Sequence, residues 1–156
     1  MIYKNVLVPY DKSVHATHAL QRALELVSDD PEAVVTVLYV TEPKQSEDVT
    51  FEAAARMAGI QSLDTGAANT MERSYRDEKR REVEKSVADV VKDAPNKILY
   101  KVATGRPQHA ILNYAYDHEC DLIVMGCRGL NALQGMMGSV SYAVVRAAEM
   151  PVFVVK

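Results

Sequence analysis

A glycine-rich segment in the last third of the sequence carries residue types that suit an anion. It begins with Gly126-Cys127-Arg128-Gly129 and ends with Gly138-Ser139, and eight residues separate Gly129 from Gly138. Glycines let backbone amides approach an anion closely, and the free amides at the start of a helix carry partial positive charge. Ser139 adds a hydroxyl and Arg128 a positive charge. The segment therefore suits a phosphate group, with glycines that only make turns as the alternative.

Two common phosphate motifs do not match this chain. A P-loop requires a lysine immediately before its terminal serine, and Gly138 stands there instead. A dinucleotide fingerprint places its glycines directly after the first strand, whereas the turn over Pro9–Ser13 contains none. Neither of these two families is supported.

Short runs of β-branched or aliphatic residues, bounded by polar or turn residues, predict the strands that position this segment. They cover residues 5–8, 34–40, 122–125 and 152–155. A fifth run, 97–102, carries two lysines and is expected nearer a sheet edge. Because the strands are apolar on both faces and alternate with helices, they predict a parallel sheet covered by helices on both sides.

Helical periodicity fills the intervals between these strands. Apolar residues three and four apart within 20–27 share one helix face, and a later helix is expected over 107–118. Asp11 or Ser13 can cap the first helix, and Ser139 can cap the last.

The length of 156 residues fits a single domain spanning 1–156. Its one irregular stretch is a long connection at about 43–68, which can hold a short helix over 51–58. Long connections in compact domains are often functional or mobile. We therefore take this connection as the candidate mobile element.

Composition argues against several classes of protein. With 18 basic and 21 acidic residues, a net charge of −3 and a pI near 5.8, the chain is not expected to bind nucleic acid. No run reaches the ~18 apolar residues that span a bilayer, and the start lacks a signal-peptide cleavage site. Cys120 and Cys127 flank a predicted strand that holds them about 23 Å apart, too far for a disulfide. We expect two reduced thiols and a soluble cytoplasmic protein.

Catalytic and metal-binding arrangements are scarce in the sequence. There is no Gly-x-Ser-x-Gly elbow and no His-Glu-x-x-His pair, so no catalytic residue and no protein-held metal site is expected. Asp11 could orient water against a terminal phosphate or help hold Mg²⁺, but one carboxylate does not make an efficient hydrolase.

Four segments together resemble the universal stress protein (UspA) family, and specifically its ATP-binding subclass. They are the opening Ile2–Ser13, the run Asp121–Gly129, and Gly138-Ser139-Val140 followed by the closing Pro151–Val155. The family pattern is Gly, two residues, Gly, nine residues, Gly and then Ser or Thr, and the longer spacer here has eight residues. The resemblance covers the chain apart from the connection at 43–68.

The resemblance implies a three-layer α/β fold of the Rossmann-like, adenine nucleotide alpha hydrolase type. Its open parallel sheet of five strands has the order 3-2-1-4-5, which places the ends of the first and fourth strands side by side. Asp11, with Pro9 and Tyr10, would form the wall at the ribose or adenine, and Val40 would meet adenine through its backbone. The implied binding residues are Pro9, Tyr10, Asp11, Val40, Met125, Gly126, Arg128, Gly129, Gly138, Ser139 and Val140.

Within this set, the resemblance gives the glycines and their neighbours separate roles. Gly126 and Gly129 would approach the ribose and the first phosphates. Gly138, Ser139 and Val140 would hold the outer phosphates, and Arg128 stands at a variable position of the motif.

The function expected from the resemblance is that of an ATP-binding sensor or regulator in the stress response. The ligand is ATP, with ADP, AMP and Mg²⁺ left open, and the apolar strand over 151–156 is expected to join a homodimer. Two alternatives stay open. One is a slow Mg²⁺-dependent ATP hydrolase, and the other is a dimeric interaction module that binds no nucleotide.

Overall fold

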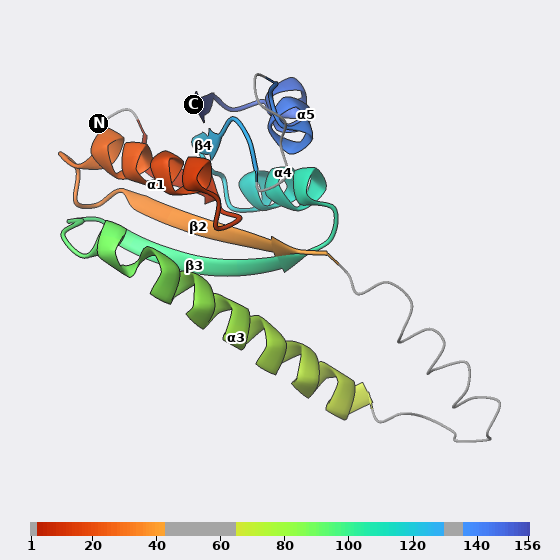
Figure 1. Ribbon diagram of the computed structural model, residues 1–156. Helices are drawn as coiled ribbons and strands as arrows, with labels where there is room; N and C mark the ends of the chain where they lie inside the picture. Colours follow the sequence, from red (N-terminus) through yellow and green to blue (C-terminus); the bar gives the residue numbers. More distant parts are fainter. Residues whose placement is uncertain (1–2, 43–64, 130–135) are drawn as a thin grey trace, which may run out of the picture.

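A computed structural model of the chain describes residues 3–42, 65–129 and 136–156, and it contains a parallel sheet of five strands (Figure 1). The strand order is β3-β2-β1-β4-β5, so the expected order 3-2-1-4-5 is confirmed and the lysine-bearing β3 lies at an edge. The elements are β1 (Asn5–Pro9), α1 (Val14–Val27), β2 (Val34–Thr41), α3 (Thr65–Val91), β3 (Lys97–Thr104), α4 (Pro107–Asp117), β4 (Leu122–Gly126), α5 (Ser139–Ala147) and β5 (Val152–Val155).

Helices cover both faces of the sheet because its central strands are apolar on both sides. Val6 and Val8 of β1 belong to a core cluster that includes buried residues of α1 and α3, whereas Leu7 between them belongs to a cluster formed with α4 and α5. Successive side chains of a strand point to opposite faces, so one apolar run fills two cores. The expectation of a sheet between two helical layers is confirmed.

The first helix begins where Ser13 provides its N-cap. The Ser13 hydroxyl accepts a hydrogen bond from the Ala16 amide at 3.1 Å. Of the two residues that we expected as candidates, Ser13 is therefore the N-cap of α1 and Asp11 is not. Asp11 lies in the preceding turn, where its Oδ1 accepts a bond from the Ser13 amide at 3.0 Å.

The last helix corrects a second expectation about caps. Gly138 is the N-cap of α5, with no side-chain cap bond, and Ser139 is the first residue inside the helix. The residue type of Ser139 had led us to expect it as the N-cap. That expectation is wrong, because Ser139 lies inside the first turn of α5.

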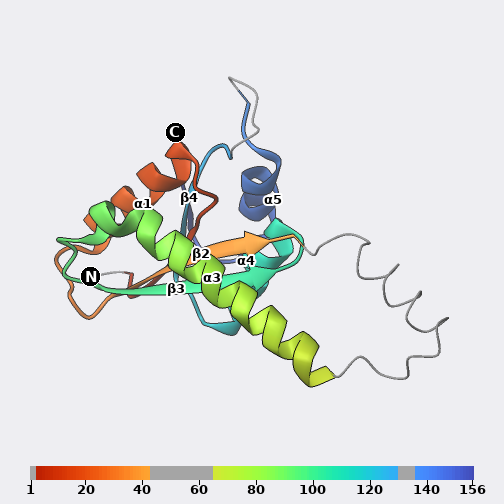
Figure 2. The same ribbon diagram turned by 60° about the horizontal axis from the view of Figure 1, so that its bottom comes forward.

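Helix α3 is long and only its second half packs on the sheet. Val83 and Val87 are buried, whereas the described residues 69–78 are all exposed, and the beginning of the helix extends past the sheet (Figure 2). The helix starts at Thr65, inside the stretch 43–68 that we expected to be connection. The short helix expected over 51–58 lies outside the described residues.

Two polar side chains tie loops together at the amino ends of the strands. The Asp121 carboxylate accepts hydrogen bonds from the backbone amides of Lys4 at 2.7 Å and Asn5 at 3.1 Å. The buried Asn96 side chain donates to the carbonyls of Val27, Asp30 and Ala33 at 3.2, 2.8 and 3.3 Å, while its own Oδ1 is buried without a partner. These bonds hold the α1–β2 turn and the start of β1 in place.

Cys120 and Cys127 are both buried free thiols. Burial raises the pKa of the Cys120 thiol to about 11, and the neighbouring Asp121 charge adds to the increase. No helix in the described part of the chain is both long and apolar enough to cross a membrane.

Candidate functional site

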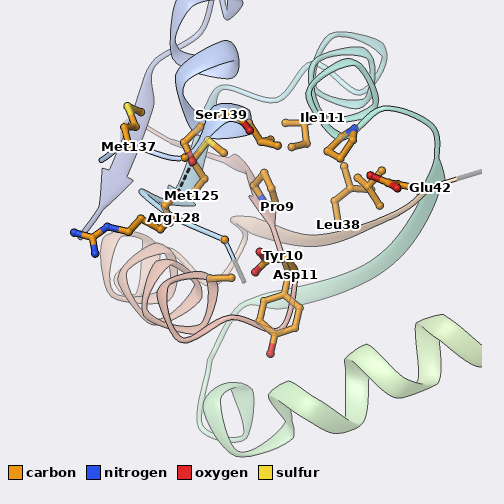
Figure 3. A pocket seen from close by; sticks show the side chains of 18 of the residues that line it. Pro9, Tyr10, Asp11, Leu38, Glu42, Ile111, Met125, Arg128, Met137 and Ser139 are labelled. Atoms are coloured by element: carbon orange, nitrogen blue, oxygen red, sulfur yellow. Dashed lines mark hydrogen bonds between the residues drawn. The ribbon is translucent and has the colours of Figure 1, made fainter. Parts of the chain in front are cut away.

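A cavity of about 580 Å³ opens at the carboxyl ends of β1, β2 and β4, beside the first turns of α4 and α5 (Figure 3). In open α/β sheets this is the edge at which ligands bind, where the strand order reverses. The sequence-predicted binding residues all line it: Pro9, Tyr10, Asp11, Val40, Met125, Gly126, Arg128, Gly129, Gly138, Ser139 and Val140. That these residues bind a nucleotide stays a prediction.

The strand order brings the two halves of this site together. Strand β1 pairs with β2 on one side and with β4 on the other, so the turn after β1 lies between the ends of its neighbours. The Tyr10 amide donates to the Leu38 carbonyl at 2.8 Å, which continues the β1–β2 ladder up to the residue before Asp11. Asp11 is thereby held at the cavity between Val40 and the glycine segment.

Asp11 and Gly129 approach each other closely across the cavity. A Cβ built on Gly129 would lie 2.6 Å from Oδ2 of Asp11, so the absence of a side chain at Gly129 makes room for the carboxylate. The other oxygen, Oδ1, is held by the Ser13 amide. The Asp11 carboxylate thus lies directly beside the glycine segment.

Lys12, the neighbour of Asp11, points away from the cavity. Its backbone has a φ of +66°, in the left-handed region, and its Nζ lies 2.8 Å from Oε2 of Glu82 on α3. The same Nζ lies 5.5 Å from the centre of the Tyr39 ring. This lysine contacts α3 and is not among the residues that line the cavity.

The ends of the glycine segment are joined by a backbone hydrogen bond, which we call the neck. The Gly138 amide donates to the Cys127 carbonyl at 2.7 Å, and a Cβ on Gly138 would lie 3.7 Å from the Gly129 nitrogen. The Ser141 hydroxyl donates to the Gly126 carbonyl at 2.8 Å and fixes the first turn of α5 against the end of β4. The neck therefore sets Gly129 and Gly138 side by side, while residues 130–135 between them lie outside the description.

Gly126 has a packing role in addition to its place at the cavity. A Cβ built on Gly126 would lie 2.8 Å from the carbonyl carbon and the Cβ of His15, in the first turn of α1. Real Cβ atoms do not approach backbone this closely, so glycine at this position lets β4 pack against α1. The sequence suggested a ligand contact for this glycine and gave no sign of this helix contact.

The charges at the cavity are few and unevenly placed. Among the described lining residues, Arg128 is the single cation, and Asp11 and Glu42 are the carboxylates. The Arg128 Nε is buried without a hydrogen-bond partner, and the guanidinium lies on the opposite side of the cavity from Glu42 (Figure 3). The guanidinium itself extends away from the cavity (Figure 3), so the positive character of the glycine side comes mainly from the first-turn amides of α5.

The other side of the cavity is apolar and was largely missed by sequence reasoning. Leu38 of β2 and Ile111 of α4 belong to the core cluster beneath it, and Glu42 lies at their side of the cavity (Figure 3). Leu38 could have been found, since it shares a strand face with the predicted Val40. The missed lining residues are Ala16, Leu38, Glu42, Pro107, Ile111, Met136, Met137 and Ser141.

Metal ligands do not gather in the described ranges. Within residues 3–42, 65–129 and 136–156, no group of three or more His, Cys, Asp or Glu side chains is placed to hold a metal ion.

A comparison with protein families and curated relatives finds one family. The model of the universal stress protein family, Usp, matches residues 2–156. The universal stress protein YxiE of Bacillus subtilis is 31% identical over 163 residues, which cover 99% of this chain and 100% of the relative.

Solved structures agree with this result. The structure of the Methanocaldococcus jannaschii protein MJ0577 covers 100% of this chain and 97% of its own at 25% identity, with a TM-score of 0.75. A universal stress protein in complex with cAMP, at 23% identity and a TM-score of 0.67, covers 100% of this chain and 99% of its own, and shares the fold. So does one from Archaeoglobus fulgidus in complex with dAMP, at 20% identity and a TM-score of 0.57, with both chains fully covered. From its sequence and its fold, the chain belongs to the universal stress protein family.

Proposed function

We propose that the cavity binds an adenine nucleotide, with ATP as its main ligand. The observation that carries this proposal is that one cavity joins an apolar side, at β2 and α4, to a glycine neck at the start of α5. A nucleotide has the same two parts, a flat aromatic base and a chain of phosphates. Because of the strand order, the apolar side of the cavity and the glycine neck lie along the same edge of the sheet.

The phosphates belong at the glycine side. The amides of the first turn of α5 have no partners within the helix and carry partial positive charge, and Ser139 adds an exposed hydroxyl there. The neck holds Gly129 and Gly138 together, so both backbones can approach a phosphate at once. Arg128 is the single cation among the described residues that line the cavity.

The base belongs at the apolar side. Leu38, Val40, Ile111 and Met125 line the cavity there and offer contact area for a planar ring. The two structural neighbours solved with cAMP and dAMP support this assignment, because those ligands share adenine and one phosphate.

The charges favour Mg²⁺ as a companion of ATP. A triphosphate brings about four negative charges to a cavity whose described lining holds two carboxylates and one arginine. The spacer from Leu130 to Met137 contains no lysine or arginine either. The Asp11 carboxylate beside Gly129 is the protein group that could help hold the ion through a water molecule.

We further propose that the protein acts in the cytoplasm as a dimeric regulator in the stress response. Strand β5 lies at an edge of the sheet, and the apolar side chain of Phe153 is 45% exposed on it. An exposed apolar edge strand favours pairing with a second copy. The two buried free thiols agree with a reducing compartment.

The test is thermal unfolding of the purified protein with and without ATP and Mg²⁺, preceded by native mass spectrometry for co-purified nucleotide and for the dimer. Ligand at 100 times its Kd adds about 2.7 kcal/mol, which corresponds to a rise of roughly 5–10 °C for a chain of this size. Release of inorganic phosphate in the same samples separates a slow hydrolase from a pure binding protein.

A matched pair of variants locates the site. A Cβ at Gly138 would lie 3.4 Å from Arg128 Cα and from the Cys127 carbonyl oxygen, so Gly138→Ala fits with little movement, whereas the methyl groups of Gly138→Val disturb the neck. We expect Gly138→Val to lose the ATP-dependent rise and Gly138→Ala to retain most of it. The proposal is wrong if no nucleotide co-purifies and ATP, ADP and AMP at millimolar concentration leave the melting temperature unchanged.

A further inference from the structure

Asp11 lies between two residues whose side chains contact α3. The Tyr10 side chain points from the cavity toward this helix (Figure 3), and its hydroxyl lies 3.4 Å from the Ser86 hydroxyl. On the other side of Asp11, Lys12 Nζ lies 2.8 Å from Oε2 of Glu82. Glu82 and Ser86 are four residues apart and therefore share one face of α3. The turn that carries Asp11 is thus attached to α3 on both sides.

Glu82 lies at the point where α3 leaves the core of the protein. The next residue, Val83, is buried, whereas the described residues 69–78 are all exposed. The Glu82 carboxylate joins two elements, because Oε2 contacts Lys12 of the turn and Oε1 lies 2.9 Å from Lys79 Nζ on the helix. These two lysines, Lys12 first, hold the pKa of Glu82 below its ordinary value. The contact is therefore part of a small charge network, which carries more weight than a lone surface ion pair.

The backbone of Lys12 has a conformation that depends on its surroundings. Its φ of +66° is uncommon for a residue with a Cβ, and strain of this kind persists where the surrounding contacts hold it. Apart from the contact with Glu82, Lys12 Nζ lies 5.5 Å from the centre of the Tyr39 ring. Loss of the contact with Glu82 allows this turn to relax, and Asp11, the direct neighbour of Lys12, then shifts relative to Gly129.

We propose that Glu82 is a positioning residue of the nucleotide site and acts through Lys12 on the turn that carries Asp11. Glu82 itself is not among the residues that line the cavity. The inference rests on the proposed binding of adenine nucleotides, and it adds α3 to the elements that determine the affinity. Because the first half of α3 extends past the sheet (Figure 2), a change in the packing of this helix alters nucleotide affinity from outside the cavity.

The sign of the effect distinguishes positioning from simple electrostatics. ATP is strongly negative, so removal of a carboxylate from its surroundings reduces repulsion and raises the affinity. Loss of a positioning contact lowers the affinity instead. Glu82→Gln keeps the size of the side chain but replaces a charged acceptor with a neutral one, which weakens the bond to Lys12. The two explanations therefore predict opposite changes in the Kd of ATP.

The experiment measures the Kd of ATP with Mg²⁺ by titration calorimetry. The samples are the unchanged protein, Glu82→Gln, Lys12→Met and the variant that combines both changes. Glu84→Gln is the matched control, because Glu84 is an exposed glutamate of α3 whose ion pair, with Arg80 at 3.7 Å, stays within the helix. Thermal unfolding of the ligand-free variants measures their stability.

We expect Glu82→Gln to bind ATP about three- to tenfold more weakly than the unchanged protein, and Glu84→Gln to differ by less than about twofold. In the Lys12→Met background, Glu82→Gln should weaken binding by less than about twofold, because the contact is already absent there. Each glutamine variant loses exposed ion pairs, which contribute little to stability, so the two melting temperatures should agree within about 3 °C.

Three results overturn the inference while nucleotide still binds. An equal or higher affinity of Glu82→Gln for ATP shows that this carboxylate does not position the site. The same weakening in the Lys12→Met background shows that Glu82 does not act through Lys12. Weaker binding together with a melting temperature far below that of Glu84→Gln shows a structural role alone. Absence of binding of ATP, ADP and AMP to the unchanged protein overturns the proposed function, and the positioning role of Glu82 falls with it.

Discussion

The two edges of the sheet use polar side chains in opposite ways. At the amino edge, Asn96 donates to three carbonyls, although its own Oδ1 has no partner, and Asp121 accepts from two backbone amides. At the carboxyl edge, Arg128 Nε and His15 Nδ1 are buried without partners, and Glu42 lines a cavity with no ion pair in the described chain.

We infer from this difference that the polar side chains at the amino edge stabilise the fold, whereas those at the carboxyl edge serve ligand binding. A buried polar group that already has its hydrogen bonds stabilises the fold, and one that lacks them and also lines a cavity, as Arg128 does, is available to a ligand. Substitutions at the amino edge should therefore lower the free energy of unfolding and leave ligand affinity intact in the folded fraction. Substitutions at the carboxyl edge should lower the affinity for the ligand and leave the free energy of unfolding nearly unchanged.

The largest expected effect is at Asn96. Asn96→Ala removes the amide group whose two N–H donors are shared among three buried or part-buried carbonyls, so we expect a loss of about 3 kcal/mol in the free energy of unfolding, measured in urea. Asn113→Ala, at an exposed position of α4, is the matched control and should change stability by less than about 0.5 kcal/mol. A loss under about 1 kcal/mol at Asn96 would show that water replaces its contacts.

A smaller loss is expected at Asp121. Asp121→Ala leaves the amides of Lys4 and Asn5 without their acceptor, at a cost of about 2 kcal/mol, and Asp121→Asn, which keeps one acceptor oxygen, should cost about half as much. Chemical denaturation with the exposed Asp117→Ala as control measures both losses. Equal stability of all three variants would contradict a structural role for the Asp121 carboxylate.

At the carboxyl edge, Gly129→Ala should weaken binding with little loss of stability. Its Cβ would meet Oδ2 of Asp11 at 2.6 Å, and this oxygen is the far end of a side chain that can rotate away. We expect the free energy of unfolding to change by less than about 1 kcal/mol and the affinity for ATP with Mg²⁺ to fall roughly tenfold. Unchanged affinity would mean that the position of Asp11 does not matter to the ligand.

The smallest effect concerns Cys120 at the amino edge. Burial raises the pKa of this thiol to about 11, so in the native protein it stays neutral at pH 9, where an unfolded chain begins to ionise it. Stability should therefore fall as the pH rises from about 9 towards 11, by less than about 1 kcal/mol near pH 9. Alkylation by iodoacetamide, followed by peptide mass spectrometry, should be slow at Cys120 until urea unfolds the protein.

Rapid alkylation of Cys120 in the folded protein at pH 8 would contradict our contrast between the two edges of the sheet, because it would mean that solvent reaches the amino edge. Cys127, at the cavity end of β4, serves as the internal comparison in the same digest.

The sequence predicted the strands and the binding loops for a physical reason. Strands covered on both faces are continuous apolar runs, and their ends, such as Pro9 and Gly126, coincide with turn residues. The strand order came from the family resemblance, and the eleven residues predicted from it to bind a nucleotide all line one cavity. Lys97–Val102 was predicted two residues too short, because Ala103 and Thr104 extend the strand through pairing with β2.

What the sequence missed depends on partners that are distant along the chain. Asn96 contacts carbonyls 63 to 69 positions away, and Asp121 contacts amides 116 and 117 positions away. Glu42 and Ile111 reach the cavity only because β2 and α4 pack beside β1 and α5. At the start of α5, Ser139 has the type of a cap, but the backbone bond of Gly138 to Cys127 fixes where the helix begins.

The neck between Gly138 and Cys127 also bears on how this loop can change in length. Because that hydrogen bond fixes both ends, an added residue in the eight-residue spacer changes only the entropy of closing a slightly longer segment. Lengthening a closed segment from eight to nine residues costs about 0.1 kcal/mol, far less than thermal energy. The family's nine-residue spacer and the eight residues here are thus nearly equivalent in the cost of closing this segment.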